Sequence, residues 1–322
     1  MASICDRRRR FGTNSSVVFE QRKLVEATAG SIRCWSALRH KVMILVFGKT
    51  GQIATELRLL ADVKVLGRDD VDLSDPATCS VAIRKHAPKA VINAAAYTAV
   101  DKAEDEEHLA TVINGEAPIA MAEECAVLGI PLIHISTDYV FKGVGTTPWS
   151  PDDVTEPQNA YGRSKLAGEI GVRNSGATHA ILRTSWVISA HGPNFVKTML
   201  RLSKTRDSLK VVADQIGGPT PAQDIATACL QMAEQLVQEP YKSGTYHFSG
   251  APDVSWADFA QEILAQADRL VTVTSIPTVE YPTPAKRPLN SRMNCRSTEQ
   301  VFGITRPDWR DGLKEILKEL GV

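Results

Sequence analysis

Short apolar runs alternate with segments of helical spacing from residue 42 to about residue 190. Continuous apolar runs rich in branched residues predict buried strands, whereas apolar residues three and four apart predict amphipathic helices. Strands are predicted over 42–48, 63–67, 89–96, 130–137 and 179–187. Helices are predicted between them over 52–61, 76–87, 113–129 and 161–174.

This alternation is typical of βαβ units, which build a parallel sheet. The strands are apolar throughout rather than at every second position, which indicates a sheet that helices cover on both faces. We therefore expect an α/β fold in which residues 42–190 form a Rossmann-type doubly wound parallel sheet.

The regular alternation weakens after residue 190. We expect residues 191–322 to form mainly a smaller C-terminal lobe that is partly interleaved with the sheet. The spacing predicts helices in this half over 195–203, 226–237, 255–267 and 308–320. It also predicts short strands over 244–250 and 271–277 and a proline-rich loop over 279–292.

Residues 1–41 differ from the rest because they are basic and polar and show no strong period. Arginine and serine content suggests a transit peptide, but Asp6, Glu20 and Glu26 argue against one, since such peptides are poor in acidic residues. The alternative that we favour is a disordered extension or an upstream start codon, with the fold beginning near Met43.

Composition excludes several classes of partner. Lys+Arg and Asp+Glu both number 37 among 322 residues, and this balance gives no support to binding of nucleic acid or a membrane surface. No apolar run approaches the roughly 18 residues of a membrane span. The six cysteines are scattered without a C-x-x-C pair, which argues against a zinc site and fits a reducing, cytoplasmic compartment.

A glycine loop, "VFGKTGQIA", follows the first predicted strand and opens the first predicted helix. Gly48 and Gly51 permit a tight turn and close approach of a pyrophosphate, and Ala54 still permits close packing of helix on strand. Because the loop lies in a strand–loop–helix context, it predicts a dinucleotide-binding site.

The second predicted strand ends in "GRDD", and side chains at this point distinguish NADH from NADPH. An acidic side chain at this point binds the ribose 2′-hydroxyl of NADH, whereas an arginine holds the 2′-phosphate of NADPH. Arg68 and Asp69 leave both open, and Lys49 adds a nearby positive charge. We favour NADPH and keep NADH as the alternative; if neither applies, Arg68 is a solvated surface charge.

A second cluster of chemistry follows the fourth strand. Thr137 ends that strand, and Tyr161 and Lys165 lie four residues apart on the next helix, so they share one face. An isolated Y-x-x-x-K is common in helices, but its combination with Thr137 and the glycine loop favours proton transfer. We expect a nearby ammonium and a nicotinamide cation to lower the pKa of Tyr161 from its ordinary value near 10.

These motifs, with "NAAAYTAVDKAE", "STDYVF", "YGRSKLAGE" and "RTSWV", resemble the extended short-chain dehydrogenase/reductase family over residues 43–322. The resemblance is greatest to its members that reduce dTDP-linked sugars, and it includes "NFVKTMLRL", "DQIGGPTPA" and "YPTPAKRPLNSRMN". It implies hydride transfer from the nicotinamide to the C4 keto carbon of a dTDP-6-deoxy-4-keto-hexose. Tyr161 would protonate the oxygen with help from Thr137 and Lys165, and the C-terminal lobe would bind the sugar nucleotide.

The resemblance also implies a set of binding residues. Those for the cofactor, in addition to Tyr161 and Lys165, are Gly48, Lys49, Thr50, Gly51, Gln52, Ile53, Arg68, Asp72, Leu73, Ala94, Ala95 and Ala96. Those for the substrate are Thr98, Val100, Tyr139, Trp186 and Arg287. For Arg287, a salt bridge at the surface or between lobes is an equal alternative to a diphosphate contact.

Some members of the family form a dimer through Mg²⁺ and glutamates. Glu56 fits one such position, but the partner after "GGPT" is Gln223, with Asp224 beside it. An amide is a poorer Mg²⁺ ligand than a carboxylate. We therefore predict no metal, treat Mg²⁺ as uncertain and leave a homodimer open.

Three rival functions share this fold. A 4,6-dehydratase needs an Asp–Glu pair after the threonine, and Tyr139 stands where the glutamate would be. A C4 epimerase would keep its NAD bound and turn over without added cofactor. A non-catalytic NADP-binding subunit, like the β subunit of methionine adenosyltransferase, can keep Y-x-x-x-K, but "YTAVDKAE" and "RTSWV" favour the enzyme.

Overall fold

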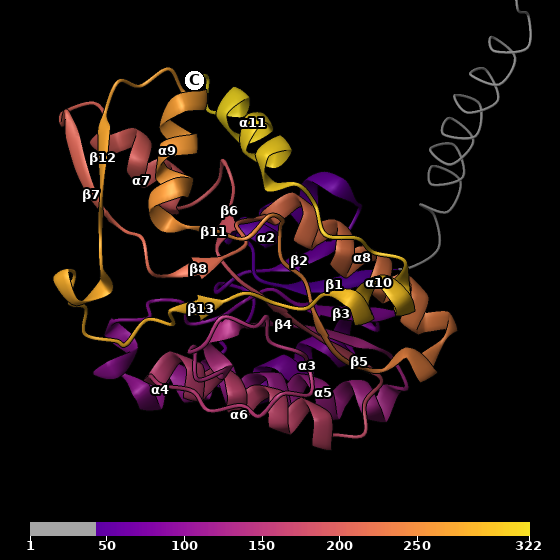
Figure 1. Cartoon of the computed structure of the whole chain (residues 1–322). Helices are drawn as coiled ribbons and strands as arrows, with labels where there is room; N and C mark the ends of the chain where they lie inside the picture. The colour runs from indigo at the N-terminus through magenta and orange to yellow at the C-terminus, as the bar shows by residue number, and fades with distance from the viewer. Residues whose placement is uncertain (1–42) are drawn as a thin grey trace, which may run out of the picture. The chain divides into compact units, whose positions relative to one another are not determined.

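The computed structural model describes residues 43–322, shown in Figure 1. The predicted extension over 1–41 lies outside the described residues. Within the described part of the chain, no helix has the length and apolar character that crossing a membrane requires. Its four cysteines, Cys79, Cys125, Cys229 and Cys295, are free and buried.

Six parallel strands form the central sheet, in the order β10-β5-β4-β3-β1-β2. Their bounds are β1 (Ile44–Phe47), β2 (Lys64–Leu66), β3 (Ala90–Asn93), β4 (Leu132–Thr137), β5 (His179–Thr184) and β10 (Gly244–His247). The predicted doubly wound parallel sheet is confirmed. Successive strands lie on opposite sides of β1, so the sheet has a topological switch point between β1 and β3.

Helices cover both faces of this sheet (Figure 1). On one face lie α3 (Pro76–His86), α5 (Ala117–Leu128) and α6 (Ala160–Asn174). On the other lie α2 (Gln52–Leu60), α8 (Ala222–Gln238) and α10 (Arg296–Phe302). Alternate residues of β1 enter the two cores, with Leu45 and Phe47 on one side and Ile44 and Val46 on the other. Because both faces are buried, each strand is apolar at every position.

The helical segment before α5 contains a turn that the sequence pattern does not predict. It runs through η1 (Lys102–Glu104), α4 (Glu107–Thr111) and the π-helical η2 (Val112–Glu116). Asn114, in the π turn, exchanges hydrogen bonds with the backbone of Tyr97 through Nδ2 (3.0 Å) and Oδ1 (2.8 Å). The wider turn thus fixes the loop that follows β3.

The remaining elements form a smaller lobe around a separate core. Its main elements are α7 (Phe195–Leu202), β7 (Ser208–Val212), α9 (Trp256–Gln266), β12 (Thr272–Ile276) and α11 (Trp309–Glu319). Short pieces complete it: β6 (Val187–Ile188), β8 (Ile216–Gly217), β9 (Thr220–Pro221), β11 (Val254–Ser255), β13 (Asn290–Ser291) and η5 (Thr278–Glu280). A further turn, η4 (Pro240–Lys242), connects α8 to β10. Three elements from this half of the chain, α8, β10 and α10, belong to the central sheet and its cover.

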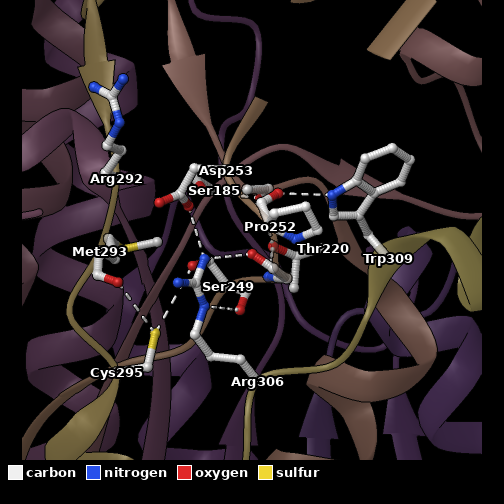
Figure 2. A network of polar contacts seen from close by, with 12 residues as sticks. Ser185, Thr220, Ser249, Pro252, Asp253, Arg292, Met293, Cys295, Arg306 and Trp309 are labelled. Atoms are coloured by element: carbon white, nitrogen blue, oxygen red, sulfur yellow. Dashed lines mark hydrogen bonds and ion pairs between the residues drawn. The ribbon is translucent and has the colours of Figure 1, made fainter. Parts of the chain in front are cut away.

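A polar network fastens α11 to the loop after β10 (Figure 2). Arg306 donates from Nε to the carbonyl of Ser249 (3.0 Å) and from Nη2 to Oδ1 of Asp253 (2.7 Å). Trp309, which is buried, donates from Nε1 to the carbonyl of Pro252 (2.7 Å). The start of the last helix is therefore held against the end of the sheet by both an ion pair and backbone contacts.

Candidate active site

A cavity of about 550 Å³ opens at the carboxyl edge of the sheet, above the switch point between β1 and β3. Ligands of open α/β sheets bind at this edge. Among the residues that line it are Thr50, Gly51, Gln52, Ile53, Ala94, Ala95, Ala96, Thr98, Val100, Thr137, Tyr139, Tyr161, Lys165 and Trp186. Loops far apart in the sequence thus bring most of the predicted site residues together.

Gly48 and Gly51 shape the turn between β1 and α2. Gly48 has a φ of +113°, and a Cβ there would lie 3.2 Å from the backbone of Ala94, so glycine is required. Gly51 is the N-cap of α2 and gives no side-chain hydrogen bond to its amides. Those amides and the helix dipole fit a pyrophosphate, and the small side chains after β3 leave room for it.

Five of the predicted cofactor residues lie outside the lining of the cavity: Gly48, Lys49, Arg68, Asp72 and Leu73. Lys49 lies over the end of β2, where its Cδ would be 2.9 Å from a Cβ added at Gly67. Asp72 accepts a hydrogen bond from the amide of Ser74 (2.9 Å), which lowers the pKa of its carboxyl, and the positive charge of Arg68 acts in the same direction. Lys49 and the exposed Arg68 thus lie on the loops after β1 and β2.

Thr137, Tyr161 and Lys165 meet at the floor of the cavity. Thr137 ends β4, while Tyr161 and Lys165 lie in the first two turns of α6. Asn159 caps this helix by accepting a hydrogen bond from the amide of Gly162 (2.8 Å). A Cβ at Gly162 would lie only 2.3 Å from the carbonyl oxygen of Tyr139, so glycine lets α6 approach the turn after β4.

The protonation state of Tyr161 differs from the sequence-based expectation. Burial raises the pKa of its hydroxyl, and the negative charge of Asp138 raises it further, whereas a hydrogen bond from Thr137 lowers it. The expected lowering by a neighbouring ammonium is wrong for the chain itself, because burial outweighs the polar contacts. Tyr161 is therefore neutral and holds its proton at the floor of the site.

Lys165 is held below Tyr161 by the strand. Its Nζ donates to the carbonyl of Ile135 (2.7 Å) and lies 3.4 Å from Nε2 of His134, whose Nδ1 contacts Asn93 (3.1 Å). Burial lowers the pKa of Lys165 to about 8, although the charge of Glu169 raises it. The ammonium is thus fixed in place and can be neutralised at a moderate pH.

Two tryptophans form the far wall of the cavity. Trp186 has a φ of +49°, a conformation that costs about 1 kcal/mol or more for a residue other than glycine. Its ring stacks on Trp256, with centroids 3.5 Å apart and planes 10° apart. A Cβ at Gly217 would lie 2.9 Å from the Trp186 ring, so Gly217 leaves space for this arrangement.

A family model described as the RmlD substrate binding domain matches residues 42–322. The chain belongs to the RmlD substrate-binding domain family. A curated dTDP-4-dehydrorhamnose reductase from Sinorhizobium fredii is 45% identical to it over 284 residues, which is 85% of this chain and 96% of that protein.

Solved structures of similar proteins have the same fold. A dTDP-4-dehydrorhamnose reductase from Clostridium acetobutylicum gives a TM-score of 0.81 at 37% identity, covering 87% of this chain and 100% of that one. One from Bacillus anthracis, in complex with NADP, gives 0.80 at 34% identity, covering 87% and 99%. These similarities extend over both the sheet and the smaller lobe of this RmlD-family chain.

Arg287 lies outside the lining of the cavity in this member of the RmlD family. Its Nη2 donates to Oδ2 of Asp101 (2.6 Å), and Asp101 also accepts from the amide of Ala285 (3.1 Å). This is the salt bridge that the sequence left as the alternative to a diphosphate contact. The positive charge of Arg287 still reaches Tyr139, whose pKa it lowers against the larger effect of burial.

Glu56 and Asp224, two of the residues considered for a metal in the RmlD family, lie close enough for the charge of Glu56 to act on Asp224. Oε1 of Glu56 accepts from Ser189 (3.1 Å) and lies 3.6 Å from Nε2 of His191. Burial raises the pKa of Asp224 to about 6, and the charge of Glu56 raises it too. Over residues 43–322, no group of three or more His, Cys, Asp or Glu side chains is arranged to hold a metal ion.

Sequence reasoning missed several residues that line the cavity, among them Asp138, Gln215, Trp256 and Pro288. Asp138 stands next to Thr137, and its position after the strand was a signal that could have found it. Trp256 and Gln215 come from the smaller lobe, and no local pattern connects them with the carboxyl edge of the sheet.

Proposed function

We propose that this chain is an NADPH-dependent dTDP-4-dehydrorhamnose reductase, which reduces the C4 keto group of dTDP-4-dehydro-L-rhamnose to give dTDP-L-rhamnose. The observation that carries the proposal is the meeting of Thr137, Tyr161 and Lys165 in one cavity with the turn after β1. Its 45% identity to a curated reductase, over 85% of this chain and 96% of that protein, supports the same reaction.

The turn after β1 fits the cofactor. Gly48 and Gly51 admit a pyrophosphate, Ala94 to Ala96 leave room beside it, and Lys49 and Arg68 give positive charge for a 2′-phosphate. When bound, NADPH supplies the hydride. We favour NADPH over NADH because these cations lie on the loops after β1 and β2, and the complex of the Bacillus anthracis relative contains NADP.

The chain's own residues handle the proton. Tyr161, neutral through burial, donates its hydroxyl proton to the oxygen at C4, and Thr137 hydrogen-bonds the same oxygen. Lys165 lies fixed on the face of α6 that Tyr161 shares, and its charge favours the phenolate that remains. In this scheme Thr98, Val100, Tyr139 and Trp186 hold the sugar from the cavity wall.

The smaller lobe mainly supplies the substrate side of the cavity. Gln215, Trp256 and Pro288 reach the cavity from it, opposite the turn that fits the cofactor.

Free, buried cysteines are typical of proteins in a reducing compartment, and the proposed biosynthetic reaction is consistent with the cytoplasm.

The test is a coupled assay with purified protein, NADPH and dTDP-4-dehydro-L-rhamnose. Loss of the absorbance of reduced nicotinamide should accompany a product heavier than the substrate by two hydrogen atoms. A non-catalytic binding subunit would bind NADPH without turnover, and an epimerase would convert substrate without consuming cofactor. Absence of turnover with both NADPH and NADH would overturn the proposal.

A further inference from the structure

Asp138 is a buried carboxyl in the wall of the cavity to which the reaction scheme assigns no role. Only 3% of the surface of this residue is exposed to solvent. Oδ1 accepts a hydrogen bond from Oγ1 of Thr137 (2.9 Å), and Oδ2 accepts one from Oγ of Ser291 in β13 (2.5 Å). A buried carboxylate needs a cation or several donors to stay ionised, and here the donors are neutral: the two hydroxyls and the backbone N–H groups of Asp138 and Tyr139.

The hydroxyl of Thr137 has one proton to donate, and the protonation state of Asp138 determines which acceptor receives that hydrogen bond. Thr137 Oγ1 already accepts from the amide of Tyr139 (3.2 Å). Beside an ionised Asp138, the proton of Thr137 is directed to the carboxylate in a charge-assisted bond. Beside a protonated Asp138, the carboxyl donates to Thr137, whose own proton then turns toward Tyr161 and the substrate oxygen.

The surroundings of Asp138 raise its pKa toward neutral pH. Burial raises the pKa of Asp138 to about 6, although hydrogen bonds from Ser291 and Thr137 lower it. Its negative charge raises the pKa of Tyr139 on the same turn and of Tyr161 on α6. A carboxylate beside a newly formed phenolate at Tyr161 would be two anions in one buried site, and a proton passed between them removes one charge.

Two further charges face this site through Tyr139. Arg287 lowers the pKa of Tyr139, and Asp101 raises it. These two side chains are paired with each other at 2.6 Å, so their charges largely cancel at Asp138. The protonation of Asp138 is therefore governed mainly by burial, Ser291 and Thr137.

We propose that Asp138 is the proton reservoir that restores Tyr161, through the hydroxyl of Thr137, after each reduction. This inference rests on the proposed reductase function. Hydride adds to C4, and the O–H bond of Tyr161 breaks as its proton forms the new hydroxyl of the product. The phenolate takes the proton of Thr137, and Thr137 takes the proton of Asp138. One proton from water then returns Asp138 to its acid form, so each turnover consumes one hydride and one proton.

Asp138→Asn is the direct test, with Asp152→Asn in the exposed part of the same loop as the matched control. The asparagine keeps the size of the side chain and, like the protonated carboxyl, offers one acceptor oxygen and a donor, but it has no transferable proton. We expect kcat to fall roughly tenfold or more with KM within about twofold. The wild-type kcat should decline as the pH rises through the pKa of Asp138, and this decline should be absent in the variant. Wild-type kcat and an unchanged pH profile in Asp138→Asn would overturn the proposal.

Ser291→Ala keeps the proposal open to refutation if Asp138→Asn does not fold. The lost hydrogen bond lowered the pKa of Asp138, so the decline in kcat should move to higher pH. A decline at the wild-type pH would contradict the assignment.

Infrared titration separates this inference from the proposed function. The infrared difference between wild type and Asp138→Asn should contain one protonated carboxyl C=O band that titrates near pH 6. The carboxyl of Asp224, whose pKa is also raised to about 6, contributes equally to both proteins and cancels. If this band titrates but no substrate turns over, the reductase function fails while the protonation of Asp138 stands. If turnover occurs and the band is absent, the reservoir fails and the function stands.

Discussion

Arg183 and Glu169 form a buried ion pair that joins β5 to α6 beneath the candidate active site. Nε of Arg183 donates to Oε1 of Glu169 (2.9 Å) and Nη2 donates to Oε2 (2.7 Å). Glu169 also accepts from Oγ of Ser136 (2.6 Å), the residue before Thr137. It lies one helical turn after Lys165. The same carboxylate therefore joins β4, which ends in Thr137, to α6, which carries Lys165.

Breaking this pair should destabilise the fold. Burial raises the pKa of Glu169, but hydrogen bonds and charge from Arg183 outweigh it, so the pKa is lowered and the side chain is ionised. Glu169→Gln leaves the guanidinium of Arg183 buried without an anion. We expect the free energy of unfolding in urea to fall by about 3–5 kcal/mol.

The same helix offers a matched control. Arg163 donates two hydrogen bonds to Glu107, but both side chains are more than two-fifths exposed. Glu107→Gln should therefore change stability by less than about 1 kcal/mol. Equal losses in the two variants would contradict the assignment of stability to the buried pair.

The sheet was predictable because its strands are buried on both faces. Continuous apolar runs gave the five strands from β1 to β5, and the helices between them followed from spacing of three and four residues. The predicted helix over 113–129 begins instead with the π turn of η2, in which Asn114 bonds the backbone of Tyr97. A tertiary contact of this kind leaves no periodic signal.

The smaller lobe was less predictable. The pattern missed β7, whose residues alternate between exposed and buried and whose pairing partner β12 lies 64 residues further along. It also missed α10, a helix of seven residues that packs on α8. Elements this short depend on tertiary packing more than on local propensity.

The residues of the candidate site also divide into those that the sequence predicts and those that only tertiary contacts bring together. Thr137, Tyr161 and Lys165 were predictable because their motifs lie at a strand end and a helix start. In a parallel sheet these positions share the carboxyl edge. The pairing of Arg287 with Asp101 and the stacking of Trp256 on Trp186 join segments 70 or more residues apart. Only the folded chain brings such residues together.

Tyr161→Phe should remove turnover but not cofactor binding. The phenyl ring keeps the packing of α6, including the edge contact with Tyr139 at 5.5 Å, but cannot donate a proton. We expect kcat to fall by roughly 10²–10⁴. NADPH affinity, measured by calorimetry, should stay within about threefold of wild type. A variant that retains more than a tenth of the wild-type kcat would refute Tyr161 as the proton donor.

Arg68→Ala should weaken discrimination between the two cofactors. If Arg68 holds the 2′-phosphate, kcat/KM with NADPH should fall about tenfold, as for a hydrogen bond to a charged group, while kcat/KM with NADH should stay nearly constant. Arg58→Ala, which removes an exposed arginine from the last turn of α2, is the control. A parallel loss with both cofactors would show that Arg68 acts on stability or on general charge rather than on the phosphate.

Trp256→Ala should loosen the wall of the cavity through Trp186. The stacked pair holds Trp186 in its left-handed backbone conformation, and an aromatic pair contributes about 0.5–1.5 kcal/mol beyond its buried area. We expect KM for the sugar nucleotide to rise about three- to tenfold, with kcat little changed, and near-ultraviolet circular dichroism to lose the signal of the stacked indoles. Trp256→Phe keeps an aromatic face and should restore most of the affinity. Equal KM values for the two variants would separate Trp256 from substrate binding.

Asp138→Asn should stabilise the protein at neutral and alkaline pH. Burial raises the pKa of Asp138 from its ordinary value near 3.8 to about 6, so the folded chain binds this proton more tightly than the unfolded chain. The resulting stabilisation is complete below pH 3.8 and is lost as the pH rises through about 6. At pH 8 the ionised carboxylate therefore costs the wild type about 3 kcal/mol relative to its acid form. Asparagine is neutral at every pH and avoids this cost.

Urea unfolding of the wild type and of Asp138→Asn across this pH range measures the effect. The difference in free energy of unfolding should grow from pH 4 to pH 7 in favour of the variant and then level off. Asp152→Asn, at an exposed position in the same loop, should show no such growth. If the difference in free energy of unfolding between wild type and Asp138→Asn stays constant with pH, Asp138 titrates alike in the folded and unfolded chains. Burial would then not raise its pKa, and the raised pKa would not support a proton reservoir at Asp138.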